Sequence, residues 1–301
     1  MTKAIDKRHL RHHTVLILCL LVVGFIMTAM NTEAAARKYV FVGDSYTTAR
    51  ATVKNPWPFL FAENMGVPKS KCRNVAKGAF GFGKPNHKFV QEIKGLKKDS
   101  TVTDVIVFGG IANDRNVSYW NIAKSMDEFN TVCRQKFPKA RIVYGLCNWN
   151  IANTDTQEKI ITRIPLYYYN AIDLGWIYLD GIEEILRDKP ELFYSDNHHP
   201  IPAGHRLIAD AVTEAYQKRC VSGIKLSRAG LRTHVGATKY VTAQVYPETA
   251  QNQEITWRST DPSVVTVDNG KLTAVGVGEA LIWARSVDGN YGAHMKVYVP
   301  H

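Results

Sequence analysis

The residues best suited to chemistry begin at Ser45, which follows a short apolar segment at residues 38–42. Gly43 and Asp44 lie between them, and a polar stretch compatible with a helix comes after. The apolar segment predicts a strand, and Gly43 lets the backbone turn sharply at its end. A serine at such a turn meets backbone N–H groups that can stabilise developing negative charge. Ser45 is therefore a candidate nucleophile, with a helix-capping serine as the alternative.

A second candidate group lies far along the chain, where Asp196 and His199 stand three residues apart. Acyl transfer by a serine needs a base within hydrogen-bond reach and a third group that holds this base in the right tautomer. An acid and a histidine on one loop can supply both. We expect Ser45 Oγ within about 3.5 Å of a ring nitrogen of His199. His198 competes for the role of base, with a surface-loop histidine as its alternative.

The elements that must position these residues alternate between strands and helices. The expected strands are 38–42, 72–76, 102–108, 140–146 and 176–179. The expected helices are 89–96, 120–137, 157–174 with an interruption near Pro165, 181–187 and 201–219. This alternation predicts a parallel sheet covered on both faces, and ligands bind such sheets beyond the carboxyl ends of the strands. Ser45, the glycine-rich turn at 78–81 and Asn113 all follow such ends.

From residue 221 onward the pattern changes to short alternating segments separated by turn signals. The expected strands are 240–245, 255–258, 264–267, 271–275, 280–284 and 295–299. Several short strands at regular spacing predict a β-sandwich, with Trp257 in its core rather than on a ligand platform. The boundary between the two domains is expected at residues 220–223.

The composition is that of a globular protein. The chain has 301 residues, of which 45% are hydrophobic and 22% charged, enough for one sizeable domain and a smaller one. The formal net charge of +11 can favour anionic partners such as wall polymers or a membrane surface. The basic residues are dispersed and no nucleic-acid-binding motif is present, so we expect no nucleic-acid partner.

Residues 1–36 have the pattern of an export signal. A positively charged start precedes an apolar run at residues 15–30, and alanines at residues 34–36 fit a small-residue cleavage site. The alternative is an uncleaved membrane anchor, since the run is almost long enough to span a bilayer. Residues 14–30 would then be the membrane contact. In either case the rest of the chain is expected outside the cytoplasm, secreted or at the cell surface.

The cysteines give no metal-binding pattern. Cys72, Cys133, Cys147 and Cys220 are widely spaced, with no C-x-x-C motif. Buried free thiols and one disulfide remain as alternatives. No metal site is predicted.

The first domain resembles the SGNH (GDSL-like) hydrolase family over about residues 38–219. The tripeptide Gly43-Asp44-Ser45 matches the family's nucleophile block, and residues 196–200 match its D-x-x-H block, which selects His199 over His198. The resemblance implies a three-layer α/β/α flavodoxin-like sheet. It also implies that Ser45 is the nucleophile, that His199 is general base and then acid, and that Asp196 orients His199.

The same resemblance implies an oxyanion hole built from the Ser45 backbone N–H, a glycine N–H and the Asn113 side-chain amide. For the glycine we choose Gly78, with Gly81 in reserve. The third block departs from the family pattern, because two residues separate Gly110 from Asn113.

The second domain resembles a bacterial immunoglobulin-like domain of group 2 over about residues 222–299. The segments that carry this resemblance are 255–257, 261–264, 267–275 and 276–280. Such modules occur on exported, surface-associated proteins as spacers or adhesive units. A contact with a cell-wall or surface glycan through this domain is therefore expected.

Together these features predict a signal or anchor at 1–36, a hydrolase domain at 37–220 and an Ig-like domain at 222–301. The expected activity is that of an exported serine esterase that removes O-acyl, chiefly acetyl, groups from a carbohydrate or wall polymer without cofactor. Trp120, Trp149 and residues 167–169 could line a sugar site, with burial in the core as the alternative. The rival activities are lipid esterase, thioesterase or acyltransferase, and the other rival is an inactive surface-binding protein.

Overall fold

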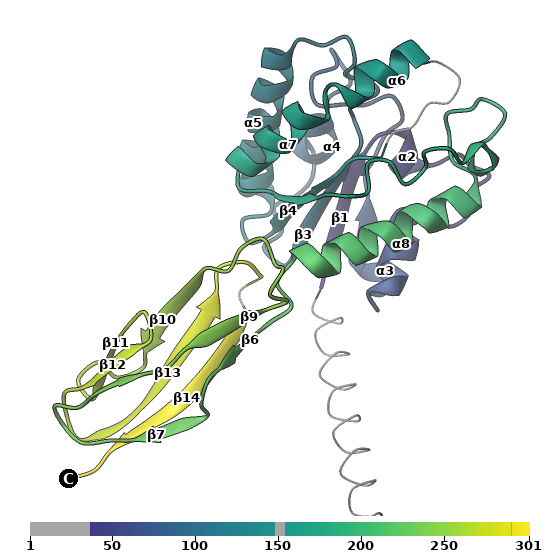
Figure 1. Cartoon of the computed structure of the whole chain (residues 1–301). Coiled ribbons are helices and arrows are strands. Elements are labelled where there is room, and N and C mark those ends of the chain that lie inside the picture. Colours follow the sequence, from purple (N-terminus) through teal and green to yellow (C-terminus); the bar gives the residue numbers. More distant parts are fainter. Residues whose placement is uncertain (1–36, 148–153, 290) are drawn as a thin grey trace, which may run out of the picture.

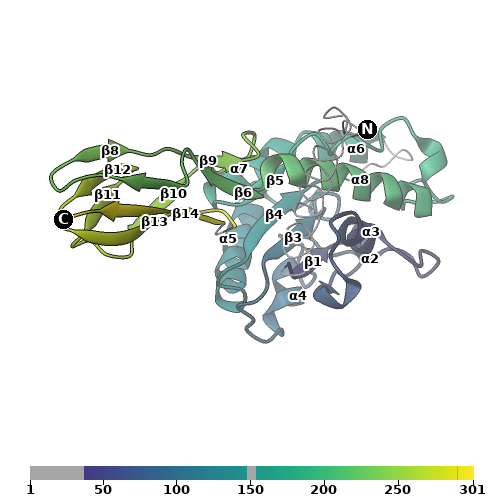
Figure 2. The ribbon, with the colours of Figure 1, turned by 90° about the horizontal axis from the view of Figure 1, so that it is seen from below.

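Figure 1 shows the computed structural model of the chain, which describes residues 37–147, 154–289 and 291–301. The predicted export segment at 1–36 lies outside these residues. The described part forms an α/β domain from which an elongated β domain projects (Figures 1 and 2). Within these residues no helix combines the length and the apolar character that a membrane crossing requires.

The α/β domain is built on a five-stranded parallel sheet with the strand order β2-β1-β3-β4-β5. Its strands are β1 (Tyr39–Gly43), β2 (Cys72–Asn74), β3 (Asp104–Phe108), β4 (Arg141–Gly145) and β5 (Ile177–Leu179). Every residue of β1 and β3 is buried, as expected for continuous apolar strands covered on both faces. The direction of winding reverses between β1 and β3, and such a switch point opens a crevice at the carboxyl ends of the strands.

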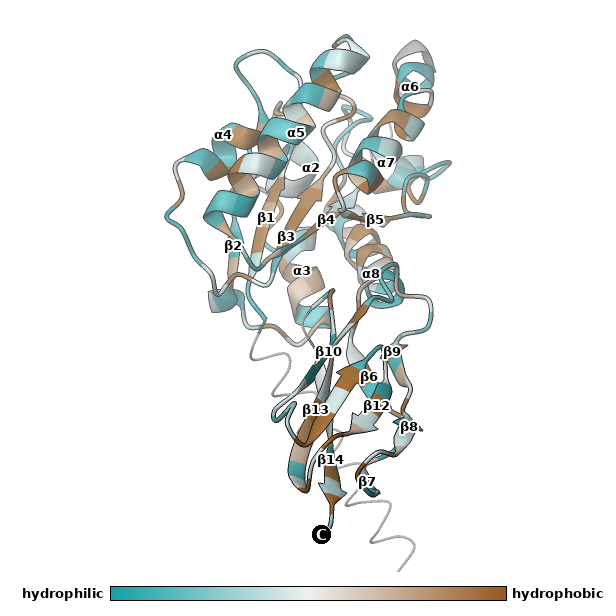
Figure 3. Ribbon diagram, turned by 90° about the vertical axis from the view of Figure 1, so that its left-hand side faces the viewer, coloured by the Kyte–Doolittle hydropathy of each residue, from teal (hydrophilic) through white to brown (hydrophobic). Residues whose placement is uncertain are grey.

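Helices cover both faces of this sheet (Figure 1). They are α2 (Ser45–Thr48), α3 (Trp57–Asn64), α4 (Phe89–Lys94), α5 (Tyr119–Lys136), α6 (Thr154–Ile161), α7 (Ile164–Asp173) and α8 (Pro202–Arg219), with short 3₁₀ turns at Lys69–Lys71 and Pro190–Leu192. One core lies under α4, α5 and α7, and a second lies under α3 and α8. Figure 3 shows the hydrophobic colour concentrated in the central strands between these layers. The predicted three-layer fold is confirmed.

The interruption expected near Pro165 is present, because α6 ends at Ile161 and α7 begins at Ile164, with Pro165 in its first turn. Pro165 has no N–H to continue the bonding of α6. One expected helix is wrong. Residues 181–187 form turns rather than a helix. Gly181 has a positive φ of 83°, and the Glu183 carboxylate accepts hydrogen bonds from the Gly181 N–H and the Tyr178 hydroxyl. These contacts replace the first turn of the expected helix.

The β domain is an all-β sandwich. Its strands are β6 (Gly223–Leu226), β7 (Gly230–Arg232), β8 (Thr238–Tyr240), β9 (Ala243–Tyr246), β10 (Ile255–Ser259), β11 (Val265–Asp268), β12 (Lys271–Ala274), β13 (Gly278–Ser286) and β14 (Gly292–Val299). They form sheets of order β10-β13-β14-β7, β11-β12-β8 and β6-β9 around one apolar core, against which Trp257 packs partly buried. The single strand expected at 240–245 is wrong, because β8 and β9 belong to different sheets.

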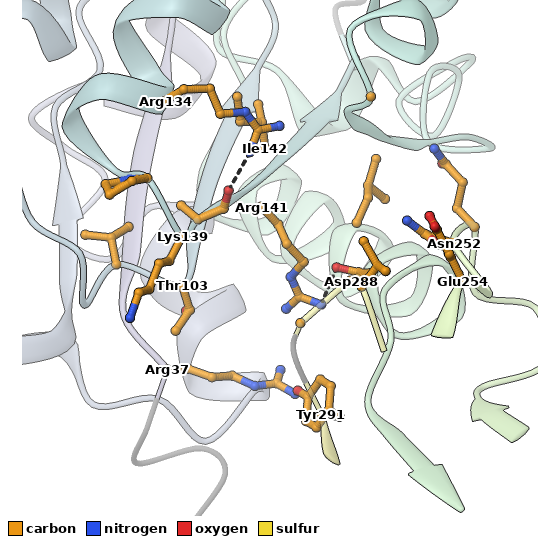
Figure 4. A pocket seen from close by; sticks show the side chains of 18 of the residues that line it. Arg37, Thr103, Arg134, Lys139, Arg141, Ile142, Asn252, Glu254, Asp288 and Tyr291 are labelled. Atoms are coloured by element: carbon orange, nitrogen blue, oxygen red, sulfur yellow. Dashed lines mark hydrogen bonds and ion pairs between the residues drawn. The ribbon is translucent and has the colours of Figure 1, made fainter. Parts of the chain in front are cut away.

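The two domains contact each other at the amino ends of the parallel strands. Arg141, at the start of β4, pairs with Asp104 at 2.7 Å and with Asp288 of the β domain at 3.5 Å. Gln251 accepts from the Tyr178 N–H and donates to the Trp176 carbonyl. A cavity of about 1140 Å³ lies beside these contacts (Figure 4). It opens at the sheet edge opposite to the one where Ser45 follows β1.

Candidate active site

Ser45 is the first residue of α2 and follows β1 through a tight turn. A Cβ on Gly43 would lie 2.5 Å from the Phe108 carbonyl oxygen, so no side chain fits between these strands. The buried Asp44 carboxylate accepts a hydrogen bond from the Tyr46 N–H at 3.0 Å and another from the Gly110 N–H at 2.8 Å. Asp44 therefore caps α2 and also fixes the nucleophile turn to the loop after β3.

The glycine-rich turn and Asn113 lie beside this serine. A Cβ on Gly78 would be 3.9 Å from the Ser45 Cβ. Within the described residues, neither the Ser45 nor the Gly78 backbone N–H donates a hydrogen bond, whereas the Gly81 N–H donates to the His87 carbonyl at 3.0 Å. The Asn113 amide donates one of its hydrogens to the Phe80 carbonyl at 2.8 Å. The free N–H groups thus belong to Ser45 and Gly78 rather than to Gly81.

Asp114 holds the loop after β3 and the glycine-rich turn together. Its buried carboxylate accepts hydrogen bonds from the Phe82 N–H at 2.7 Å, the Gly83 N–H at 3.0 Å and the Tyr167 hydroxyl at 3.0 Å. Burial raises the pKa of Asp114 to about 6 in spite of these donors. The irregular spacing before Asn113 is therefore accommodated in a loop that still reaches the Phe80 turn.

The carboxyl group of Glu92, on α4, joins the turn that carries Ser45 to the glycine-rich turn. The sequence analysis missed this residue. Its carboxyl oxygens accept from the Gly43 N–H at 3.1 Å and the Lys77 N–H at 3.0 Å. Burial, supported by the nearby Asp44, raises the pKa of Glu92 to about 9. A signal was present, since Glu92 stands three residues after Phe89 on the apolar face of its helix.

The second candidate group forms a tight acid–histidine pair. The Asp196 Oδ2 lies 2.6 Å from the His199 Nδ1, and the Asp196 Oδ1 accepts from the His199 N–H at 3.0 Å and from the His198 N–H at 3.1 Å. These hydrogen bonds outweigh the effect of partial burial and hold the pKa of Asp196 well below its usual range. An ionised Asp196 on Nδ1 leaves Nε2 of His199 to face a reacting group.

His198 packs between the two halves of the site. Its ring centroid lies 5.6 Å from the Tyr46 ring and 4.8 Å from the His199 ring. Burial, reinforced by His199, lowers the pKa of His198 to about 4, so this imidazole is neutral above that pH. His198 thus links the residue after Ser45 to the residue that carries the base. The ring contacts of His198 indicate that it packs the two loops together and does not act as the base.

The loops that carry Ser45 and His199 are neighbours, yet no hydrogen bond joins Ser45 Oγ to the His199 ring among the interactions of the described residues. The expected contact between Ser45 Oγ and the His199 ring therefore stays a prediction. Catalytic hydrogen bonds often tighten only when substrate binds. The Asp196–His199 half of the arrangement is already assembled.

Arg50, which the sequence analysis also missed, pairs with the Asp196 carboxylate at Oδ2. Its guanidinium lies 4.9 Å above the Tyr194 ring, and the neighbouring Thr52 hydroxyl is 2.7 Å from the Tyr194 hydroxyl. The segment after α2 is thereby attached to the loop that carries Asp196 and His199.

We expect the Arg50→Gln variant to lower kcat/KM for ester hydrolysis by about fivefold, because a partly exposed ion pair of this kind contributes up to about 1 kcal/mol to holding the segment after α2 against the loop of Asp196 and His199. Initial rates on p-nitrophenyl acetate check this expectation. Arg50→Lys, which keeps the charge, is the control and should lose less activity. An Arg50→Gln variant with the wild-type kcat/KM contradicts this role.

The described residues contain no group of three or more metal-ligating side chains placed to hold an ion. Cys72, Cys133, Cys147 and Cys220 are all free thiols, which answers the question that the sequence left open for these residues. The predicted site needs no thiol.

The aromatic candidates for a sugar site divide into two kinds. Tyr167 is buried and belongs to the core, where it bonds to Asp114. Trp120 and Tyr169 are exposed. Trp149 lies outside the described residues.

Comparison with known proteins finds a similarity for each domain. Residues 220–297 match the bacterial Ig-like domain (group 2). A GDSL lipase of Mycobacterium tuberculosis is 24% identical over 184 residues, covering 57% of this chain and 78% of that protein. Lacto-N-biosidase of Bifidobacterium bifidum is 43% identical over 70 residues, 23% of this chain and 6% of that protein. An uncharacterised protein of Clostridium acetobutylicum is 42% identical over 57 residues, 19% of this chain and 14% of that protein. The chain therefore spans only a small part of these last two relatives.

Among solved structures, TesA matches with a TM-score of 0.50 at 13% identity, over 60% of this chain and 98% of TesA. A likeness at this identity concerns the fold. Both resemblances found in the sequence are confirmed: the α/β domain has the fold of the SGNH (GDSL-like) hydrolases, and a bacterial Ig-like domain follows it.

Proposed function

We propose that this chain, which joins an SGNH-fold domain to a bacterial Ig-like domain, is an exported serine esterase that removes O-acyl groups from a carbohydrate or wall polymer. The single observation that carries the proposal is the 2.6 Å contact between Asp196 Oδ2 and His199 Nδ1 on the loop that adjoins the Ser45 turn. The similarity to a GDSL lipase supports ester hydrolysis as the reaction class.

In this mechanism Ser45 Oγ attacks the ester carbonyl while Nε2 of His199 takes its proton. Asp196 holds the Nδ1–H and stabilises the imidazolium. The tetrahedral oxyanion accepts hydrogen bonds from the Ser45 and Gly78 N–H groups and from the second amide hydrogen of Asn113. Each such donor contributes roughly 3 kcal/mol to transition-state stabilisation. The alcohol leaves with the proton from His199, and water then releases the acid from the acyl-enzyme.

The openness of the site favours a polymer substrate. Ser45 is half-buried and Gly78 is exposed, so an acyl group on a large chain can reach the serine without entering a tunnel. The export pattern at residues 1–36 and the Ig-like domain support a location where wall polymers and surface glycans are the available substrates.

Hydrolysis of p-nitrophenyl esters of increasing chain length tests the proposal. We expect turnover of the acetate ester, with kcat/KM falling as the acyl chain lengthens. Turnover of long-chain esters alone would replace the proposal with a lipid esterase, which the name of the mycobacterial relative suggests. A folded protein with no turnover of any ester, but with glycan binding, would indicate an inactive surface-binding protein.

A further inference from the structure

One surface patch beside the candidate site combines exposed aromatic rings with arginines. It consists of Arg115, Tyr119, Trp120 and Arg163, which we call the α5 patch. The Trp120 side chain is 77% exposed and that of Tyr119 is 53% exposed. A tryptophan normally buries most of its large apolar surface. Two adjacent exposed rings at the start of α5 make this patch a candidate contact surface for a ligand.

The topology places this patch on the catalytic edge of the sheet. Because α5 follows β3 in a parallel sheet, its first residues lie at the carboxyl ends of the strands, where Ser45 also lies. The chain passes directly from Asn113 through Arg115 to Tyr119. A polymer whose ester group lies at Ser45 can therefore continue past Asn113 onto the patch.

Backbone contacts hold both arginines in place. Arg115 Nη1 donates to the Ala112 carbonyl at 2.8 Å, and Arg163 Nη1 donates to the Val117 carbonyl at 2.8 Å. The Arg163 guanidinium lies 4.9 Å from the centre of the Tyr119 ring. Within the described residues neither arginine forms an ion pair with a carboxylate. Each keeps further donors for an anionic oxygen, and the planar guanidinium binds carboxylate or phosphate in two-pronged fashion.

The side of the site opposite to the α5 patch also carries positive charge. Lys77 is exposed, stands next to Gly78 and extends over the Phe80 ring at 5.5 Å. Arg50 adjoins Asp196. Cations therefore flank the path from Ser45 to the patch, and among the described residues Asp196 is the acid that pairs with one of them.

The apolar part of the patch fits sugar rings better than a lipid surface. Among the described residues of the α/β domain, the large exposed hydrophobic side chains are all aromatic: Tyr119, Trp120 and Tyr169. Among these residues no exposed leucine, isoleucine or phenylalanine is present that could insert between the acyl chains of a membrane. Flat rings beside fixed guanidinium groups can stack on sugar faces and pair with carboxylates of the same polymer.

We propose that the α5 patch is a substrate-binding extension that takes an acylated polysaccharide bearing carboxylate or phosphate groups. This inference rests on the proposed esterase function, because it concerns the substrate class of the same site. The patch gives the enzyme a preference for anionic over neutral polymers, and a small ester such as p-nitrophenyl acetate does not span it.

The test compares O-acetylated polygalacturonate, O-acetylated dextran and p-nitrophenyl acetate as substrates of the full chain. Trp120→Ala is expected to lower kcat/KM on both polymers, relative to p-nitrophenyl acetate, by about tenfold. Arg163→Gln is expected to lower it on polygalacturonate alone. The matched control is Arg73→Gln, an exposed arginine on the edge strand β2 of the same domain, which should leave all three rates unchanged.

The outcomes separate the two proposals. Patch variants that behave like Arg73→Gln, in a protein that hydrolyses p-nitrophenyl acetate, overturn the α5 patch and leave the esterase standing. A protein without any turnover overturns the esterase; binding to polygalacturonate that Trp120→Ala weakens would then still support the patch. Binding to phosphatidylglycerol vesicles but not to polygalacturonate, lost in Trp120→Ala, replaces the polysaccharide with a lipid surface and overturns the proposal.

For phosphate as the alternative anion, O-acetylated phosphodextran takes the place of polygalacturonate. A preference for one of the two anionic polymers identifies the charged group. Equal activity on anionic and neutral polymers in the wild type contradicts the assignment of the arginines.

Discussion

The Ser45→Ala variant is expected to lower kcat/KM for ester hydrolysis by about 10⁴-fold or more. Alanine keeps the Cβ beside Gly78 and leaves the turn intact, because Ser45 Oγ makes no hydrogen bond within the described residues. Only the nucleophilic oxygen is lost, so the variant should fold and melt like the wild type. Initial rates on p-nitrophenyl acetate, measured together with thermal unfolding, check both statements.

Ser70→Ala is the matched control, since Ser70 is exposed and its side chain makes no hydrogen bond among the described residues. It should retain wild-type activity. If Ser45→Ala kept more than about one tenth of the wild-type rate, no acyl-enzyme on Ser45 could carry the reaction.

His199→Ala is expected to lower kcat/KM by about 10⁴-fold, whereas His198→Ala should cost less than about tenfold. The two residues are adjacent, yet the Asp196 carboxylate meets the ring of His199 and only the backbone N–H of His198. Burial, reinforced by His199, lowers the pKa of His198 to about 4, which makes it a poor proton acceptor at neutral pH.

Adding imidazole to the two variants distinguishes a lost base from a collapsed site. Free imidazole can enter the gap in His199→Ala and restore part of the activity, whereas it should not change His198→Ala. A larger loss in His198→Ala than in His199→Ala would reverse the assignment of the base.

The fold could be predicted because its central strands are continuous apolar runs that admit few alternatives. The strands β1 and β3 are buried along their whole length, as expected for apolar strands covered on both faces. The helix expected at residues 181–187 failed because of side-chain hydrogen bonds. Residues 181–187 have helical composition, but the Glu183 carboxylate bonds to Gly181 and Tyr178 and stabilises turns. The spacing of apolar residues along the sequence does not show whether such side-chain hydrogen bonds will form in place of a helix.

The candidate site shows the same division. Ser45 and the Asp196–His199 pair stand out because their roles require short, fixed spacings on single loops. Arg50 has no such spacing, since 146 positions separate it from the Asp196 that it contacts. Glu92 joins two turns from a third element and is 49 positions from Gly43. Residues that brace a site from elsewhere in the chain become visible only once the fold brings them together.

Covalent labelling by a fluorophosphonate, read by intact mass and peptide mapping, tests the central claim most directly. The reagent phosphonylates a serine that a neighbouring base activates. We predict one adduct per chain on the peptide that contains Ser45, with labelling slowed strongly in His199→Ala and little in His198→Ala. A protein that hydrolyses esters but carries the label on another residue, or carries none, would contradict a Ser45 nucleophile activated by His199.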